Sequence, residues 1–338
     1  MPPAKEDVMA CARFVAPSFT LLFLVLSTDA GGAVAGARPY PTKPIRVVIA
    51  QGPGSSIDTM SRVVFNKMSE LLGQQMIMDN RVGAGGTIGG DIVARAEPDG
   101  YTLFACATAS QVIGPQIYTS TRRYDPFKDF RPVSQFAVTQ NVLVVNPKTP
   151  FKSVQELVTF AKEHPAKLNW SNAGSGFQSH LAGVYFTHMA GIQVLHVPYK
   201  GAGPSLAAAV AGESQVTFVP APSVMGLVRN GQLRALAVGG AKRSSVAPDL
   251  PTVAEAGVAG FDLVGWAGLA APSGIAKPVF DRLYRTLHAA VGDAQTRNAM
   301  VKAGAEPLVG SPQEFEALIR RDWKNYGDAI RVAGLKPN

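Results

Sequence analysis

The sequence predicts an α/β fold made of two lobes, each a mainly parallel sheet flanked by helices. Short β-branched segments alternate with amphipathic segments from residue 44 onward, which is the order expected for strands joined by crossover helices. The chain has 338 residues, of which 46% are hydrophobic and 17% charged. This is an ordinary globular composition, and the length is sufficient for two domains of modest size.

The first part of the chain alternates regularly between strands and helices. We expect strands at residues 45–50, 75–79 and 101–105 and helices at residues 57–72 and 87–96. Gly73 directly follows the first helix and suits its C-terminal cap. Glycine-containing loops at residues 51–56 and 83–86 follow the first two strands. These segments predict the beginning of the first lobe.

The regular order is interrupted at residues 111–132 before a strand at residues 142–145. Asn146-Pro147 and Pro150 then indicate a linker, so we place the second lobe at residues 146–262 and the first at residues 40–145 plus 263–338. We expect a helix to residue 162 and, as further strands of the second lobe, residues 168–170, 193–196, 215–219 and 233–238. Residues 261–271 would lead the chain back, followed by helices at residues 277–291, 293–303 and 312–332. Such an inserted lobe creates two crossing segments and a cleft that closes by a hinge.

The N-terminus has the pattern of a secretory signal peptide. Arg13 precedes an apolar stretch at residues 14–26, which is too short to cross a bilayer comfortably. Small residues follow, so we expect residues 1–37 to be a signal peptide cleaved near Ala35 or Ala37 and the protein to be periplasmic. The alternative is a buried N-terminal helix.

Cleavage leaves Cys106 as the single cysteine, which excludes an internal disulfide and favours a buried strand position.

The net charge of +8 is compatible with several anionic partners. The basic residues are scattered, however, and no basic segment interleaved with aromatic residues indicates a nucleic-acid groove. We therefore expect no nucleic-acid partner, and read the charge as a solvated positive surface.

Five glycine-containing or polar loops follow predicted strands, where ligands of open parallel sheets collect. They are residues 51–56, 83–86, 107–111, 171–178 and 198–203. Glycine allows backbone N–H groups to approach an anion, and the N-terminus of the next helix adds partial positive charge. The candidates in these loops are Pro53, Gly54, Ser55, Ser56, Thr108, Ser110, Ser175, Gly176, Tyr199, Lys200 and Gly201. Alternatively, each loop is only a tight turn, and Lys200 is a solvated surface residue.

The templates for catalysis fit poorly. Ser175 lies in an Ala-Gly-Ser-Gly-Phe segment that departs from the G-x-S-x-G elbow, although His180 is five positions away. The histidines lack the H-E-x-x-H spacing of a zinc site, and neither glycine-rich nucleotide motif is present. We therefore expect no enzyme, cofactor or metal, with a hydrolase using Ser175 or Ser179 and His180 as the rival hypothesis. His180 would otherwise position its loop, and Trp266 would cover the ligand or pack between the lobes.

Several segments together resemble the periplasmic receptors of tripartite tricarboxylate transporters, often called Bug receptors. The matching segments are YPTKPIR at residues 40–46, NRVGAGG at 80–86, PDGYTL at 98–103, SHLAG at 179–183, HVPYKG at 196–201 and LPTVAEAG at 250–257. Their order covers nearly the whole processed chain, from about residue 40 to residue 336.

The resemblance implies a two-lobe Venus-flytrap receptor that binds a small carboxylate and delivers it to a membrane permease. A sensory receptor that presents its closed form to a sensor kinase is the alternative. The family's two anion-binding loops correspond to residues 53–58 and 171–180, which adds Asp58, Ser179 and His180 to the candidates. We expect a monomer.

Two departures from the family pattern bear on the ligand. Ser55 replaces the usual second glycine of the first loop, and Glu213-Ser214-Gln215-Val216-Thr217 replaces the common Gly-Gln-Val-Asp segment. Residues 218–222 lack the acidic or amide residues often found there. This pattern favours a carboxylate without an amino group, aromatic or otherwise apolar.

Overall fold

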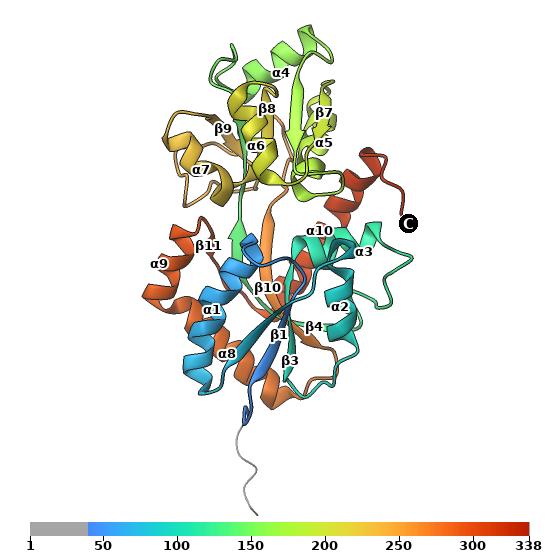
Figure 1. The fold of residues 1–338 in the computed structure, drawn as a ribbon, viewed down its shortest axis with the longest axis vertical. Helices are drawn as coiled ribbons and strands as arrows, with labels where there is room; N and C mark the ends of the chain where they lie inside the picture. Colours follow the sequence, from blue (N-terminus) through green and yellow to red (C-terminus); the bar gives the residue numbers. More distant parts are fainter. Residues whose placement is uncertain (1–39, 338) are drawn as a thin grey trace, which may run out of the picture. The chain divides into compact units, whose positions relative to one another are not determined.

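The computed structural model describes residues 40–337 and contains two sheets, each flanked by helices (Figure 1). The expected signal peptide and its cleavage site lie outside the described residues. The predicted α/β class is confirmed.

The first sheet has six strands in the order β11-β4-β10-β3-β1-β2. Its strands are β1 (Ile45–Ile49), β2 (Met76–Asn80), β3 (Thr102–Ala107), β4 (Phe130–Thr139), β10 (Gly265–Pro272) and β11 (Glu306–Pro307). Strands β1, β2 and β3 are parallel, so their carboxyl ends lie at one edge, whereas β10 runs antiparallel to both β3 and β4. The loops that follow β1, β2 and β3 therefore meet at one edge of this sheet.

Helices cover both faces of the first sheet. They are α1 (Ser56–Leu72), α2 (Thr87–Ala94), α3 (Gly114–Ile117), α8 (Lys277–Gly292), α9 (Ala294–Lys302) and α10 (Pro312–Val332), with a 3₁₀ turn at Ala84–Gly86 and a π-helical turn at Ala109–Ile113. Apolar residues of α1, α8 and α9 pack on one face, and residues of α2 and α10 pack on the other. A capping box between Ser311 and Glu314 begins α10, the helix expected at residues 312–332. Cys106 is buried in β3, also as predicted.

The second sheet has five strands in the order β7-β6-β8-β5-β9. They are β5 (Asn141–Val145), β6 (Asn169–Asn172), β7 (Leu195–Pro198), β8 (Val216–Pro220) and β9 (Arg234–Val238). Helices α4 (Val154–Glu163) and α5 (Gln178–Ala190) pack on one face, and α6 (Ala202–Ala211) and α7 (Ala221–Arg229) pack on the other. Strands β6, β7 and β8 are parallel, so the loops after them also share an edge.

Two expectations about residues 111–145 were wrong. Strand β4 was not predicted, because Pro132 and the buried polar residues Ser134 and Gln135 interrupt its apolar pattern. Strand β5 was placed in the first lobe, but it pairs with β8 and β9 in the second sheet. The chain thus passes from the first sheet to the second at Gln140, before the proline-rich segment that indicated a boundary.

The return from the second sheet to the first runs beside this outward passage. Asn141 accepts a hydrogen bond from the N–H of Gly239 at 2.9 Å, and Gly239 accepts one from the N–H of Leu263 at 2.9 Å. Trp266, on β10, is buried, and its indole N–H donates to Asp322 at 2.8 Å. The side chain of Trp266 therefore belongs to the packed interior and is not among the residues that line the cavity described below.

Candidate functional site

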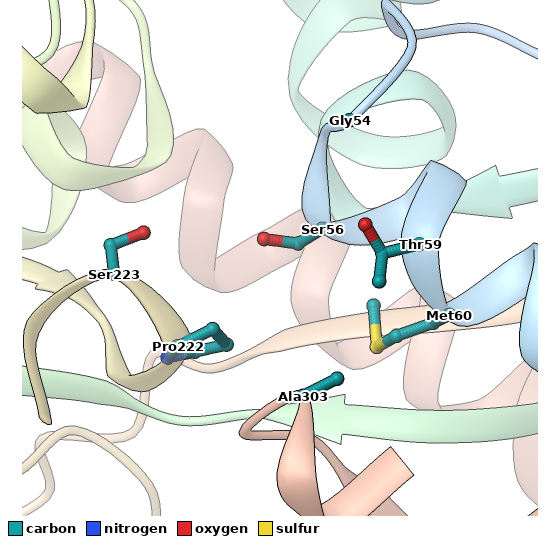
Figure 2. A pocket seen from close by; sticks show the side chains of 7 residues that line it. All are labelled: Gly54, Ser56, Thr59, Met60, Pro222, Ser223 and Ala303. Atoms are coloured by element: carbon teal, nitrogen blue, oxygen red, sulfur yellow. The ribbon is translucent and has the colours of Figure 1, made fainter. Parts of the chain in front are cut away.

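A cavity of about 220 Å³ lies between the first turn of α1 and the first turn of α7 (Figure 2). Its lining residues are Gly54, Ser56, Thr59, Met60, Pro222, Ser223 and Ala303. Figure 2 shows the hydroxyl groups of Ser56 and Ser223 pointing toward one another across the cavity. None of the lining residues is charged, so a charged ligand would be held by dipoles, backbone groups and hydroxyls.

Both helices present their N-termini to this cavity. Ser55 caps α1, because its Oγ accepts a hydrogen bond from the N–H of Asp58. Helix α7 has no side-chain cap, and Pro222 in its first turn has no N–H to satisfy. The N-terminus of a helix carries partial positive charge, and here two of them lie on opposite sides of one cavity. The arrangement favours an anion.

The loop between β1 and α1 is fixed by the carboxylate of Asp58, whose side chain is only 4% exposed. This carboxylate accepts hydrogen bonds from the N–H of Gly54 at 2.9 Å, from Nε and Nη2 of Arg62 at 3.0 and 2.9 Å, and from Asn80 at 3.0 Å. Burial acts to raise the pKa of Asp58, but the hydrogen bonds from Arg62, Gly54 and Asn80 outweigh it and hold that pKa below its usual range. Asp58 is thus an ionised structural group, and Gly54 donates its N–H to it.

The loop between β6 and α5 is held by neutral groups. Asn172 accepts from the N–H of Gly174 at 3.0 Å, Ser179 from the N–H of Ala173 at 3.0 Å, and Nδ1 of His180 from the N–H of Gly176 at 3.2 Å. Ser175 is exposed, and Phe177 is 60% exposed. Helix α5 has no side-chain cap. This loop therefore presents an uncapped helix N-terminus beside an exposed aromatic ring.

The imidazole of His180 acts as an acceptor and is therefore neutral with its proton on Nε2. Its ring centroid lies 6.0 Å from that of His196, edge to face. Burial lowers the pKa of His180. Burial, followed by the neighbouring His180, lowers the pKa of His196 to about 4. Both rings are neutral near pH 7, so they add no cation to the loop.

The segment at residues 199–201 is joined to the same loop through its backbone. The N–H of Tyr199 donates to Asn172 at 2.9 Å, and the N–H of Gly201 donates to Ala173 at 3.0 Å. Gly201 has a φ of 111°, which favours glycine. Lys200 is exposed and Tyr199 is half-buried. The structure thus places Tyr199, Lys200 and Gly201 next to the loop that contains Ser175 and Gly176.

Two of the predicted candidates have other roles in this structure. Thr108 is buried and accepts a hydrogen bond from the N–H of Trp266 at 3.0 Å. Ser110 is buried and exchanges hydrogen bonds with the backbone of Ala107 at 3.0 and 3.3 Å. Neither lines the cavity. Pro53 is exposed next to Gly54 on the first loop.

The second-lobe loop is also linked to the crossing segment. Gln178, the first residue of α5, donates to the hydroxyl of Tyr326 at 3.1 Å. That hydroxyl in turn donates to the carbonyl of Val264, just before β10, at 3.0 Å. A displacement of the loop before α5 would therefore also strain the segment before β10, and the reverse.

Comparison with known proteins identifies the family. A family model described as "Tripartite tricarboxylate transporter family receptor" matches residues 60–335. The chain belongs to this family. It is 31% identical over 314 residues to Protein BugT of Bordetella pertussis, covering 93% of this chain and 96% of the relative.

Two solved structures extend the comparison to ligands. The receptor resembles Rpa4515 of R. palustris, solved with adipate, at 32% identity and a TM-score of 0.76, covering 88% of this chain and 100% of that one. It also resembles MatC of Rhodopseudomonas palustris, solved with malate, at 28% identity and a TM-score of 0.72, covering 86% of this chain and 100% of that one. Members of this family are solute-binding receptors and not enzymes, as expected.

The described residues show no serine–histidine hydrogen bond of the kind that the rival hydrolase hypothesis requires. No hydrogen bond there joins His180 to Ser175 or Ser179, and the hydroxyl of Ser179 accepts from Ala173. Over residues 40–337, no group of three or more histidine, cysteine or acidic side chains is arranged to hold a metal ion. No helix in the same range is long and apolar enough to cross a membrane.

On the second-lobe side of the cavity, residues 218–222 were noted for their lack of acidic and amide side chains, but neither Pro222 nor Ser223 was among the predicted site residues. Pro222 and Ser223 follow β8, and the rule that selected the loops after other parallel strands applies to this strand as well. Thr59 and Met60 lie in α1 itself, after the predicted loop at residues 51–56. Ala303 comes from the end of α9, and no local pattern indicates it.

Proposed function

We propose that this protein is a periplasmic receptor that binds a small carboxylate in the cavity between α1 and α7 and delivers it to a membrane permease. The observation that carries the proposal is the pair of helix N-termini facing one cavity whose lining has no charged side chain. Backbone N–H groups and the hydroxyls of Ser56 and Ser223 can hold an anion there without competition from a resident acid.

The lining favours an acid that carries no amino group. Met60, Pro222 and Ala303 supply apolar surface, and none of the lining residues supplies a carboxylate for an ammonium group. Asp58, the nearest acidic side chain on α1, is already held by Arg62, Asn80 and Gly54. Adipate and malate, the ligands of two relatives, are both acids of this class.

We further propose that residues 40–140 with 263–338 form one lobe and residues 141–262 the other, with the hinge where the two passages between the sheets lie side by side. The change from the expected boundary follows the pairing of β5. The hydrogen bonds among Gln178, Tyr326 and Val264 support coupling between the start of α5 and the hinge.

A thermal-shift screen tests the function directly. The protein is recovered from the periplasm of an expressing bacterium, its N-terminus is determined by mass spectrometry, and mono-, di- and tricarboxylates are compared with matched amino acids and amides. A ligand that binds only the folded state raises the midpoint of unfolding by mass action. We expect a saturable rise with acids and intact recovery of the compound. No rise with any acid contradicts the carboxylate claim, and conversion of the compound contradicts a receptor.

The proposed partner is tested separately by ligand-dependent capture. With the acid bound, the immobilised protein is expected to retain a membrane permease from a detergent extract of the source cells. Retention of a sensor kinase and no permease contradicts the transport role.

A further inference from the structure

Arg62 does not line the cavity, but it forms an ion pair with Asp58. Its guanidinium pairs with the Asp58 carboxylate through Nε at 3.0 Å and Nη2 at 2.9 Å, and Nη2 also donates to Asn80 at 3.2 Å. Asp58 and Arg62 are four residues apart on α1, which places them on one face of the helix. Asp58 directly precedes Thr59 and Met60, which line the cavity.

The same network fixes the backbone of the first loop at two points. Asn80 donates to the carbonyl of Gln51 at 2.8 Å as well as to Asp58. Asp58 accepts the N–H of Gly54, whose φ is 77°. The loop that faces the ligand is thus held by three side chains that do not line the cavity.

The charge of Asp58 makes this arrangement more than a structural clamp. A carboxylate near an anion site repels the incoming ligand unless a cation balances it, because like charges repel at short range. Arg62 is the cation that the described residues pair with Asp58.

We propose that Arg62 is a positioning and specificity-determining residue: it neutralises Asp58, so that the cavity accepts a carboxylate and gains nothing from a ligand ammonium group. This inference rests on the proposed function and names the residue behind its selectivity. Loss of Arg62 would leave an uncompensated carboxylate beside the ligand. Acids would then bind more weakly, and their amino-substituted counterparts would lose less.

The test is isothermal titration of Arg62→Gln with matched pairs of ligands, succinate against aspartate and glutarate against glutamate. For the wild-type protein we expect the acid without the amino group to bind at least tenfold more tightly within a pair. In Arg62→Gln, the Kd of that acid is expected to rise about tenfold, equivalent to about 1.4 kcal/mol, and the selectivity within the pair to shrink. An unchanged Kd overturns the inference.

A second variant separates charge from structure. Adding Asp58→Asn to Arg62→Gln removes the uncompensated charge but keeps an oxygen to accept the N–H of Gly54. We expect the double variant to recover acid binding to within about threefold of the wild type. If acid binding stays as weak as in Arg62→Gln alone, the role of Arg62 is structural and the proposal is wrong.

A control uses another arginine that pairs with an aspartate four residues earlier. Arg95, the C-cap residue of α2, pairs with Asp91 at 2.9 Å from Nε to Oδ1. Arg95→Gln is expected to leave every Kd unchanged, and circular dichroism checks that all variants fold. If the wild-type protein binds no acid at all, the proposed function fails. If it binds acids and Arg62→Gln does so equally well, only the present inference fails.

Discussion

The loop before α1 in the first sheet and the loop before α5 in the second are held in different ways. The loop before α1 depends on an ion pair, in which Asp58 gathers hydrogen bonds from Gly54, Arg62 and Asn80. The loop before α5 depends on neutral acceptors, namely Asn172, Ser179 and the unprotonated imidazole of His180. The stability of the first loop should therefore depend on the charge of Asp58. The stability of the second should depend on the imidazole of His180 remaining unprotonated.

The largest effect is expected from Asp58→Ala in the first loop. This change removes the common acceptor of four hydrogen bonds and leaves the guanidinium of Arg62 without its partner. The loss of a buried charged acceptor is expected to lower the free energy of unfolding by about 3 kcal/mol. Urea unfolding of the variant measures it, and a loss no larger than that of Ser179→Ala would remove the proposed difference between the loops.

Acid should act mainly on the second loop and its neighbour His196. Because the pKa of His196 is lowered to about 4 in the folded protein, the unfolded chain takes up a proton between the ordinary value of 6.5 and about 4 that the folded chain does not. Stability is thus complete above about pH 6.5 and falls as the pH approaches 4, by on the order of 2 kcal/mol.

Urea unfolding at pH 7.0 and pH 4.5 tests this expectation. His196→Gln should lose much less stability between the two pH values than the wild type does. If the free energy of unfolding falls equally in the wild type and in His196→Gln, groups other than His196 cause the acid sensitivity. The pKa of Asp58 is also lowered, but Asp58 is present in both proteins, so the difference between them reports on His196.

Gly54→Val sharpens the comparison at the ligand-facing tip of the first loop. A Cβ at Gly54 meets nothing within 4 Å, but the φ of 77° is unfavourable for a β-branched residue and costs about 1.5 kcal/mol. The side chain would project from a cavity-lining position, so we expect acid binding to weaken about tenfold with the core intact.

Gly73→Val provides the control for Gly54→Val. Gly73 caps the opposite end of α1 with a φ of 67°, and a Cβ there also meets nothing within 4 Å. It should cost similar stability and leave the Kd unchanged. Equal binding by both variants would remove the first loop from the site.

Ser179→Ala is expected to have the smallest effect. The buried N–H of Ala173 loses its neutral acceptor, which lowers stability by about 1 kcal/mol. Chemical denaturation measures this change, and Ser175→Ala, at an exposed position in the same loop, is the matched control. A loss of 3 kcal/mol or more would show that the second loop also depends on a single residue.

The fold could be predicted from the sequence where the spacing of apolar residues agrees with the residues that begin and end each element. Helix α10 has the bounds expected from the sequence, residues 312–332. Strand β4 was not predicted because it buries the polar residues Ser134 and Gln135, and no local pattern reveals that Ser134 donates to the distant carbonyl of Gly310. Strand β5 was found, but its sheet was not, because partner choice depends on β8 and β9 far along the chain.

The candidate site was predicted only in part for a similar reason. The glycine-containing loops indicated Gly54 and Ser56, which line the cavity. Thr108 and Ser110 follow a strand as well, but a π-helical turn and backbone contacts bury them. Arg62 carries no signal by itself, since an arginine four residues after an aspartate is a common pair on an exposed helix.

The most direct test of the account is the Kd of the tightest-binding acid for Ser223→Asp and Ser223→Asn. Both side chains have nearly the same size and enter the cavity from the exposed first turn of α7, but only aspartate adds a negative charge. If the cavity holds a carboxylate, Ser223→Asp should raise the Kd at least thirtyfold, and Ser223→Asn should stay within about fivefold of the wild type. Equal affinities for the two variants would contradict the claim that the anion binds between α1 and α7.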